Sequence, residues 1–222
     1  MCCRRGAALD RRFRYLLCRY SDTNFLVASC LASLHQLRVL ETMKDPVEVL
    51  MEDDHDSLGK LLAELDGELA TQNVPRAFEL LDLFWARLAV HIRAENLHLF
   101  PALANASASL FSGKGSLPTS EDTHNIILQL RSDHDFFMKE LANMMKTARE
   151  VNADVKAAAK CSDDFRKRLS VIGKRLEAHN LLEEEQVYTW PASIFDEKTV
   201  AKLRERLQHE LENLPPRISE SH

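Results

Sequence analysis

Residues 84–101 read FWARLAVHIRAENLHLFP, and this stretch decides the fold. Its apolar side chains recur every three or four residues, a period that predicts a helix with one buried face. His91 and Glu95 stand four residues apart on that same face, so both side chains should point into the core. An unpaired carboxylate there would be costly, so this Glu needs a cation or a hydrogen-bond donor beside it.

The same pattern returns later in the chain. Residues 179–188, HNLLEEEQVY, again give a His, a Glu four residues on, and an aromatic side chain nine residues after the His. Each pattern is preceded in an earlier helical segment by a D-H-D triplet, at residues 54–56 and 133–135. We interpret the chain as an internal duplication of one helical unit.

The remaining periodicity predicts an all-α, antiparallel up-down four-helix bundle. Only 6 Gly and 7 Pro occur in 222 residues, which is atypical of short-stranded β architectures. The first helix is expected to begin at Asp45-Pro46 and to end near 72, and the second to begin at Pro75 and to end near 101. The third is expected to begin near Thr123, and the fourth to be capped by Ser162-Asp163-Asp164. An irregular loop is expected at about 105–120, and a charged amphipathic helix at about 197–212.

The predicted bundle spans residues 43–195, and residues 196–222 form a C-terminal helix and tail. Its core faces are stripes of large apolar side chains, namely Leu58, Leu62, Leu65 and Leu69, then Leu81, Phe84 and Leu88, then Phe137, Leu141, Met144 and Met145, and finally Phe165, Leu169, Ile172 and Leu176.

The N-terminal segment differs from the rest in charge. Residues 1–40 hold seven Arg and two Asp, a net charge of +5, which leaves −10 for the remaining residues. We expect residues 1–42 to be an extension outside the fold: a disordered tail, an organelle presequence or an upstream extension of the reading frame ahead of Met43. Four of the five Cys lie in this segment, so the bundle itself contains a single Cys and cannot form an internal disulfide. A reducing, cytoplasmic location is therefore favoured for the bundle.

Membrane and nucleic-acid partners are not expected. No run of residues approaches 18 consecutive apolar side chains, and the net charge of −5 provides no basic field.

Antiparallel packing should bring both duplicated patterns to one depth in the bundle. The late part of the second helix then lies level with the early part of the third, and the fourth helix level with the first. Four imidazoles and two carboxylates would surround one cavity, a mixed nitrogen and oxygen donor set that suits iron. The candidate metal ligands are His55, His91, Glu95, His134, His179 and Glu183.

A competing pattern is the Glu-x-x-His pair of ferritin-like di-iron sites. Glu52 with His55 and Glu121 with His124 both match it. The second pair, however, falls ten residues before His134, roughly 15 Å along a helix, which is too far to share its site.

These motifs together resemble the hemerythrin-like HHE cation-binding family over about residues 45–195. The resemblance implies a four-helix bundle around a non-haem di-iron centre with two iron ions per chain. It implies the six ligands named above, with Glu95 and Glu183 as bridging carboxylates. Oxygen-carrying hemerythrins use five histidines, one glutamate and one aspartate, whereas four histidines and two glutamates match here. Fewer imidazoles favour reactivity over reversible oxygen storage.

Four further residues are candidates for supporting the ligands. Asp54 and Asp133 are placed to orient imidazoles, or to lie at a solvated helix start. Tyr188 is a candidate hydrogen-bond donor to a bound ligand, although its counterpart Phe100 suggests simple packing. His98, with Gln186 as its counterpart, is a candidate hydrogen-bond partner of a ligand or a partly exposed side chain. His35, His209 and His222 lie outside the repeat.

Several functions share this ligand set. The leading hypothesis is a centre that binds or reacts with dioxygen, nitric oxide or peroxide. The alternatives are iron sensing through metal-dependent folding and binding of a protein partner, an enzymatic peroxide-consuming or iron-centre-repairing activity, and a mononuclear zinc protein.

Overall fold

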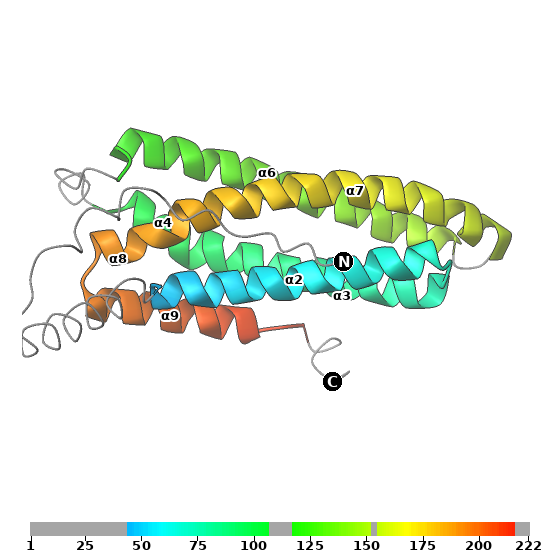
Figure 1. Ribbon diagram of the computed structural model, residues 1–222, viewed down its shortest axis with the longest axis horizontal. Helices are drawn as coiled ribbons and strands as arrows, with labels where there is room; N and C mark the ends of the chain where they lie inside the picture. Colours follow the sequence, from blue (N-terminus) through cyan, green and yellow to red (C-terminus); the bar gives the residue numbers. More distant parts are fainter. Residues whose placement is uncertain (1–43, 107–116, 152–154, 216–222) are drawn as a thin grey trace, which may run out of the picture. The chain divides into compact units, whose positions relative to one another are not determined.

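The computed structural model describes residues 44–106, 117–151 and 155–215. Its framework is four long helices, each packed against the next around a closed ring, and α7 returns to α2 (Figure 1). Neighbouring helices run in opposite directions, and the described residues include no strand. The predicted all-α up-down bundle is therefore confirmed. The four helices are α2 (Pro46–Ala70), α3 (Val74–Ala94), α6 (Ser120–Val151) and α7 (Val155–Glu185).

The first helix begins where the sequence predicts. Asp45 is its N-cap: Val47 N donates to Asp45 Oδ1 at 2.6 Å, and Glu48 closes a capping box. The helix ends before Gln72, whose φ of 59° is left-handed and turns the chain tightly into α3.

The fourth helix begins earlier than predicted. Ser162-Asp163-Asp164 was expected to cap it, but α7 already begins at Val155 and these residues lie within it. The intervening sequence, with three consecutive Ala at 157–159, has strong helix propensity, which outweighs the capping tendency of Ser and Asp. The third helix begins at Ser120, close to the expected Thr123.

Both helices that carry a His-x-x-x-Glu pair lose regular geometry just after the Glu. In the first half, α3 passes into a π-helical turn, η2 (Glu95–Leu99), and then α4 (Phe100–Ala104). In the second half, α7 ends at Glu185 and is followed by a 3₁₀ turn, η3 (Val187–Thr189), and then α8 (Trp190–Ile194). One long helix to residue 101 was expected, so the π-helical turn is a departure from the prediction.

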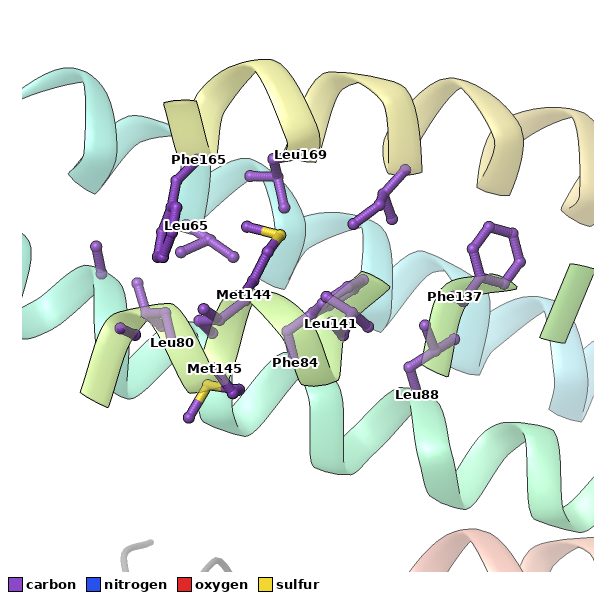
Figure 2. Packing of buried hydrophobic residues seen from close by; sticks show 14 of the residues in the cluster. Leu65, Leu80, Phe84, Leu88, Phe137, Leu141, Met144, Met145, Phe165 and Leu169 are labelled. Atoms are coloured by element: carbon purple, nitrogen blue, oxygen red, sulfur yellow. The ribbon is translucent and has the colours of Figure 1, made fainter. Parts of the chain in front are cut away.

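The long helices bury a continuous apolar group, here called the inner cluster (Figure 2). It confirms the four predicted stripes, except that Leu62 is only partly buried. Its members are Leu58, Leu65, Leu69, Ala77, Leu80, Leu81, Phe84, Leu88, Ile92, Phe137, Leu141, Met144, Met145, Ala148, Phe165, Leu169, Ile172 and Leu176.

A second apolar group, the closing cluster, is built largely by the shorter elements. The amphipathic helix α9 (Glu197–Glu212) has the predicted limits and packs on α2, α3 and η2. The cluster comprises Val47, Met51, Ala94, Leu99, Phe100, Leu103, Ile127, Leu130, Val187, Tyr188, Trp190, Ile194, Val200, Leu203 and Leu207.

Two expectations fall wholly or partly outside the described residues. The extension at 1–42 is one, and most of the loop expected at 105–120 is the other. Within the described ranges, every helix is too short or too polar to cross a membrane.

Candidate metal centre

The structure brings the six predicted ligands together in the bundle. The two histidines of the D-H-D triplets come from α2 and α6. Of the two His-Glu pairs, one joins the end of α3 to the first residue of η2, and the other lies near the end of α7. All six side chains are buried, and the two glutamates are 0% exposed. They are His55, His91, Glu95, His134, His179 and Glu183.

The four imidazoles form two pairs, each joining neighbouring helices. His55 Nε2 lies 3.1 Å from His91 Nε2, and His134 Nε2 lies 3.2 Å from His179 Nε2. Early residues of α2 and α6 therefore lie level with late residues of α3 and α7, as antiparallel packing predicts.

Each glutamate lies between a histidine of its own helix and one from another helix. Glu95 Oε2 is 3.6 Å from His91 Nε2 and 3.2 Å from His134 Nε2. Glu183 places Oε1 3.2 Å from His179 Nε2 and Oε2 3.4 Å from His55 Nε2. Both carboxylates are thus positioned to touch two imidazoles at once.

These donors fall into two compact groups that share one carboxylate. Within each group, one donor atom per residue lies within 4.8 Å of all the others. The groups are Glu95, His134, His179 and Glu183, and His55, His91 and Glu183.

Asp54 supports the imidazole of His91. Its Oδ2 accepts from His91 Nδ1 at 2.9 Å, and its Oδ1 accepts from Arg87 Nη2 at 2.7 Å. Burial raises the pKa of Asp54, but the hydrogen bond from His91 and the charge of Arg87 outweigh burial and hold that pKa below its ordinary value. The aspartate therefore stays ionised and fixes the imidazole orientation.

Asp133 occupies the corresponding position in the second half. Its Oδ2 lies 3.4 Å from His179 Nδ1, and its Oδ1 lies 2.6 Å from Arg175 Nη2. Sequence reasoning did not include the two arginines. The signal was present, because Arg87 and Arg175 each precede their His by four residues and extend the repeat to R-x-x-x-H-x-x-x-E.

Two more missed residues contact the imidazoles of α2 and α6. His55 Nδ1 donates to Glu184 Oε1 at 2.7 Å. Asn96 Nδ2 lies 3.3 Å from His134 Nδ1, while Asn96 Oδ1 accepts from Arg131 Nε. Asn96 and Glu184 each directly follow the glutamate of their half, and that equivalence was the available signal.

Tyr188 reaches the middle of the site. Its hydroxyl donates to Glu95 Oε1 at 2.7 Å and lies 3.1 Å from both Glu183 Oε2 and His55 Nε2. Burial and the charges of the two glutamates raise the pKa of Tyr188 well above its usual value, so it keeps its proton. Its counterpart Phe100 instead stacks on His134, with ring centroids 5.7 Å apart.

His98 is turned toward another part of the molecule. Its Nε2 lies 3.7 Å from Glu210 Oε2 of α9. Its side chain is 24% exposed, which agrees with the expectation of a partly exposed histidine, and the π-helical turn that contains it changes the helical register after His91. Of the two ferritin-like pairs, His55 alone reaches the centre, because Glu52 pairs with Lys44 and His124 is exposed.

The electrostatics of the site favour bound cations. Burial lowers the pKa of His55, but its hydrogen bonds to Glu183 and Glu184 outweigh that effect and raise the pKa to about 10. Burial raises the pKa of Glu183, but the charges of His179 and His55 hold it well below its ordinary value. Glu183 therefore remains anionic and attracts positive charge.

The free electron pairs of the donors point to where a cation fits. The Nδ1 atoms of His55 and His91 each face a carboxylate, which leaves their two Nε2 atoms facing each other 3.1 Å apart. Glu95 Oε2 and Glu183 Oε1 are buried without a partner of hydrogen-bonding geometry. A metal ion between these atoms would bind the opposed Nε2 atoms and give the two buried carboxylate oxygens a partner, so the residues present fit a metal.

Comparison with known proteins identifies the family. The family model for the hemerythrin HHE cation binding domain matches residues 47–190. No curated protein and no solved structure matches the chain. The matched range spans the four long helices and includes all six converging residues. The chain therefore belongs to the hemerythrin HHE cation-binding domain family.

Proposed function

We propose that the buried centre holds two iron ions, bridged by Glu95 and Glu183, and that it binds or reacts with dioxygen or a related small oxidant such as nitric oxide or peroxide. The observation that carries this proposal is the pair of donor groups sharing Glu183. Two groups with a common carboxylate suit two ions bridged by that carboxylate, with His55 and His91 on one ion and His134 and His179 on the other.

A single zinc ion is less well supported. Structural zinc is usually held by four ligands in tetrahedral geometry. The site offers six buried donors, and the remaining two would stay desolvated without a partner.

The surrounding residues suit chemistry with a small oxidant. A bound iron pair would supply two electrons at one point. The Tyr188 hydroxyl, which keeps its proton, is a hydrogen-bond donor directed into the same space. Phe100 and Phe137 cover the His134 and His179 side with aromatic rings, which limits the access of water. A reducing compartment such as the cytoplasm would return oxidised iron to the ferrous state.

Metal content tests the proposal. Purified protein should contain about two iron ions per chain, with the near-ultraviolet absorption of an oxidised dinuclear centre. His91→Ala and His179→Ala should each lose iron, because each removes a buried imidazole donor. His124→Ala should retain it, because His124 is exposed and distant from the other donors. One zinc ion per chain without colour would overturn the proposal.

Oxygen exposure then separates carriage from reaction. Ferrous protein should oxidise irreversibly on mixing with dioxygen, with no return of the ferrous spectrum on deoxygenation. A fully reversible spectrum would instead identify an oxygen carrier.

Iron sensing is a second candidate, favoured by the origin of the donors. All four long helices contribute ligands, so metal ties the whole bundle together. The test is limited proteolysis of iron-loaded and iron-free protein. Sensing predicts faster cleavage without iron, and equal cleavage rates would exclude it.

A further inference from the structure

The duplicated halves support two of their histidines alike and the other two differently. His91 and His179 each face an aspartate from a neighbouring helix. Each aspartate also pairs with an arginine that precedes the histidine by four residues on the histidine's own helix. His55 and His134 have no such matched support. The residue facing His55 is Glu184, a carboxylate, and the residue facing His134 is Asn96, a neutral amide.

A carboxylate on Nδ1 strengthens an imidazole as a ligand. The hydrogen bond from His55 to Glu184 is 2.7 Å long, and a carboxylate can only accept. This holds a proton on Nδ1, makes Nε2 the atom that faces the metal position, and increases the electron density on the ring. Its neighbour His91 has the same kind of support from Asp54 at 2.9 Å. Both imidazoles of this pair are therefore prepared for a cation.

The other pair is less well prepared. Arg131 Nε donates to Asn96 Oδ1 at 3.1 Å, which turns the amide nitrogen toward His134 Nδ1. In that orientation the amide offers His134 Nδ1 a donor and no acceptor, whereas a histidine that binds metal through Nε2 carries its proton on Nδ1. Binding an ion through Nε2 therefore requires the amide to rotate and its bond with Arg131 to break. The remaining support, Asp133, stands at a longer 3.4 Å from His179.

We propose that the two metal positions are unequal: the position at His55 and His91 binds its ion first and more tightly, and Glu184 and Asn96 set that order. This inference rests on the proposed dinuclear centre. Glu184 and Asn96 are positioning residues, because each acts through the histidine that it contacts. The duplicated unit thus holds one firmly bound ion and one that exchanges more readily.

The first test is an anaerobic titration of the metal-free full chain with Fe²⁺ against a competing chelator. Wild-type protein should bind two ions in two separable steps. Glu184→Gln should weaken the tighter step by about 10–100-fold, the usual effect of losing a carboxylate behind a ligating histidine. The matched control is Glu185→Gln, which removes the same charge from the next, exposed residue of α7 and should change neither step.

The reciprocal variant tests the weaker position. Asn96→Asp places a carboxylate of the same shape beside His134 Nδ1, and should tighten the second step by about tenfold or more. Mössbauer spectra at one equivalent of ⁵⁷Fe give an independent readout. Wild-type protein should show one quadrupole doublet, whereas Glu184→Gln and Asn96→Asp should each show two, because the ion then divides between positions.

The possible outcomes distinguish a failure of the unequal metal positions from a failure of the proposed dinuclear centre. Two ions with equal affinities in wild-type protein would overturn the inequality and leave the dinuclear centre standing. So would a Glu184→Gln variant that weakens both steps equally, because that is the result of a merely structural role. A single bound ion would overturn the dinuclear centre itself.

Discussion

The two apolar clusters on either side of the metal centre are built from different kinds of structure. The inner cluster draws only on the four long helices, whose regular turns bring a side chain to the core every three or four residues. The closing cluster draws on helix ends, the two irregular turns, α4, α8 and α9. Regular helices therefore supply a packed interior, and departures from regularity close the end next to the ligands.

The breaks in helical geometry occur at the point where they affect the site. The first begins at Glu95 and is followed by Phe100, and the second begins four residues after Glu183 and contains Tyr188. Through these breaks, Phe100 comes to stack on His134 and Tyr188 to contact both glutamates. Two halves with the same spacing in sequence thus present different groups to the ligands.

The largest effect on stability is expected in the inner cluster. Phe84 is 0% exposed, and Phe84→Ala should lower the free energy of unfolding by about 3–5 kcal/mol through lost burial and a residual cavity. Urea denaturation at fixed iron content measures this. Leu128→Ala, at a half-exposed position of α6, should change it by less than about 0.5 kcal/mol. A Phe84 variant as stable as wild type would contradict the assignment of this cluster as the stabilising core.

A somewhat smaller effect is expected in the closing cluster. Leu207 of α9 is also 0% exposed, and Leu207→Ala should cost about 2–4 kcal/mol. Because α9 packs beside the centre, on α2, α3 and η2, this variant should also release bound metal to a chelator faster. Lys202→Ala, at an exposed position of the same helix, serves as control. Unchanged release would show that α9 does not restrict access.

The centre between the clusters should respond to pH when metal is removed. The folded-state pKa of His55 is about 10, above its ordinary value of 6.5. Its contribution to stability is therefore complete below pH 6.5 and is lost as the pH rises through about 10. The unfolding free energy of metal-free protein should fall by up to about 1 kcal/mol per pH unit in this window.

Urea denaturation at a series of pH values measures that slope. His55→Gln should flatten it, and His124→Gln, at an exposed position, should leave it unchanged. Stability that is constant or rising between pH 7 and 9 would contradict the proposed protonation of His55.

The smallest effect is expected at the start of α2, beside the closing cluster. Asp45→Ala removes the acceptor for Val47 N and should cost about 1 kcal/mol. Asp45→Asn keeps an oxygen in the same place and should retain most of that stability. Thermal unfolding of the two variants compares them, and equal losses would show that the cap contributes through charge alone.

The sequence predicts the inner part of this structure better than the closing part. The helical period identified most of the large side chains of the inner cluster around Phe84 and Phe165, because a regular helix repeats its faces, but it did not include Leu80 and Ile92. It could not identify the π-helical turn at 95–99, since no periodic signal marks where one residue is added to a turn.

The metal centre likewise has a part that the sequence predicts and a part that it does not. The six converging residues were found because i and i+4 positions share a helix face and the pattern occurs twice. Partners on different helices, such as Glu184 with His55, depend on how neighbouring helices are rotated about their axes. Spacing along one helix carries no information about that rotation, so these contacts needed the three-dimensional structure.

The place of α9 in the chain has a consequence for the timing of assembly. During synthesis the four ligand-bearing helices leave the ribosome before α9, because residues 197–212 follow all of them. The ligands can therefore meet while the end of the bundle beside them is still open. A metal ion that arrives during this interval would meet an uncovered centre, and one that arrives later would have to pass the end of the bundle that α9 covers.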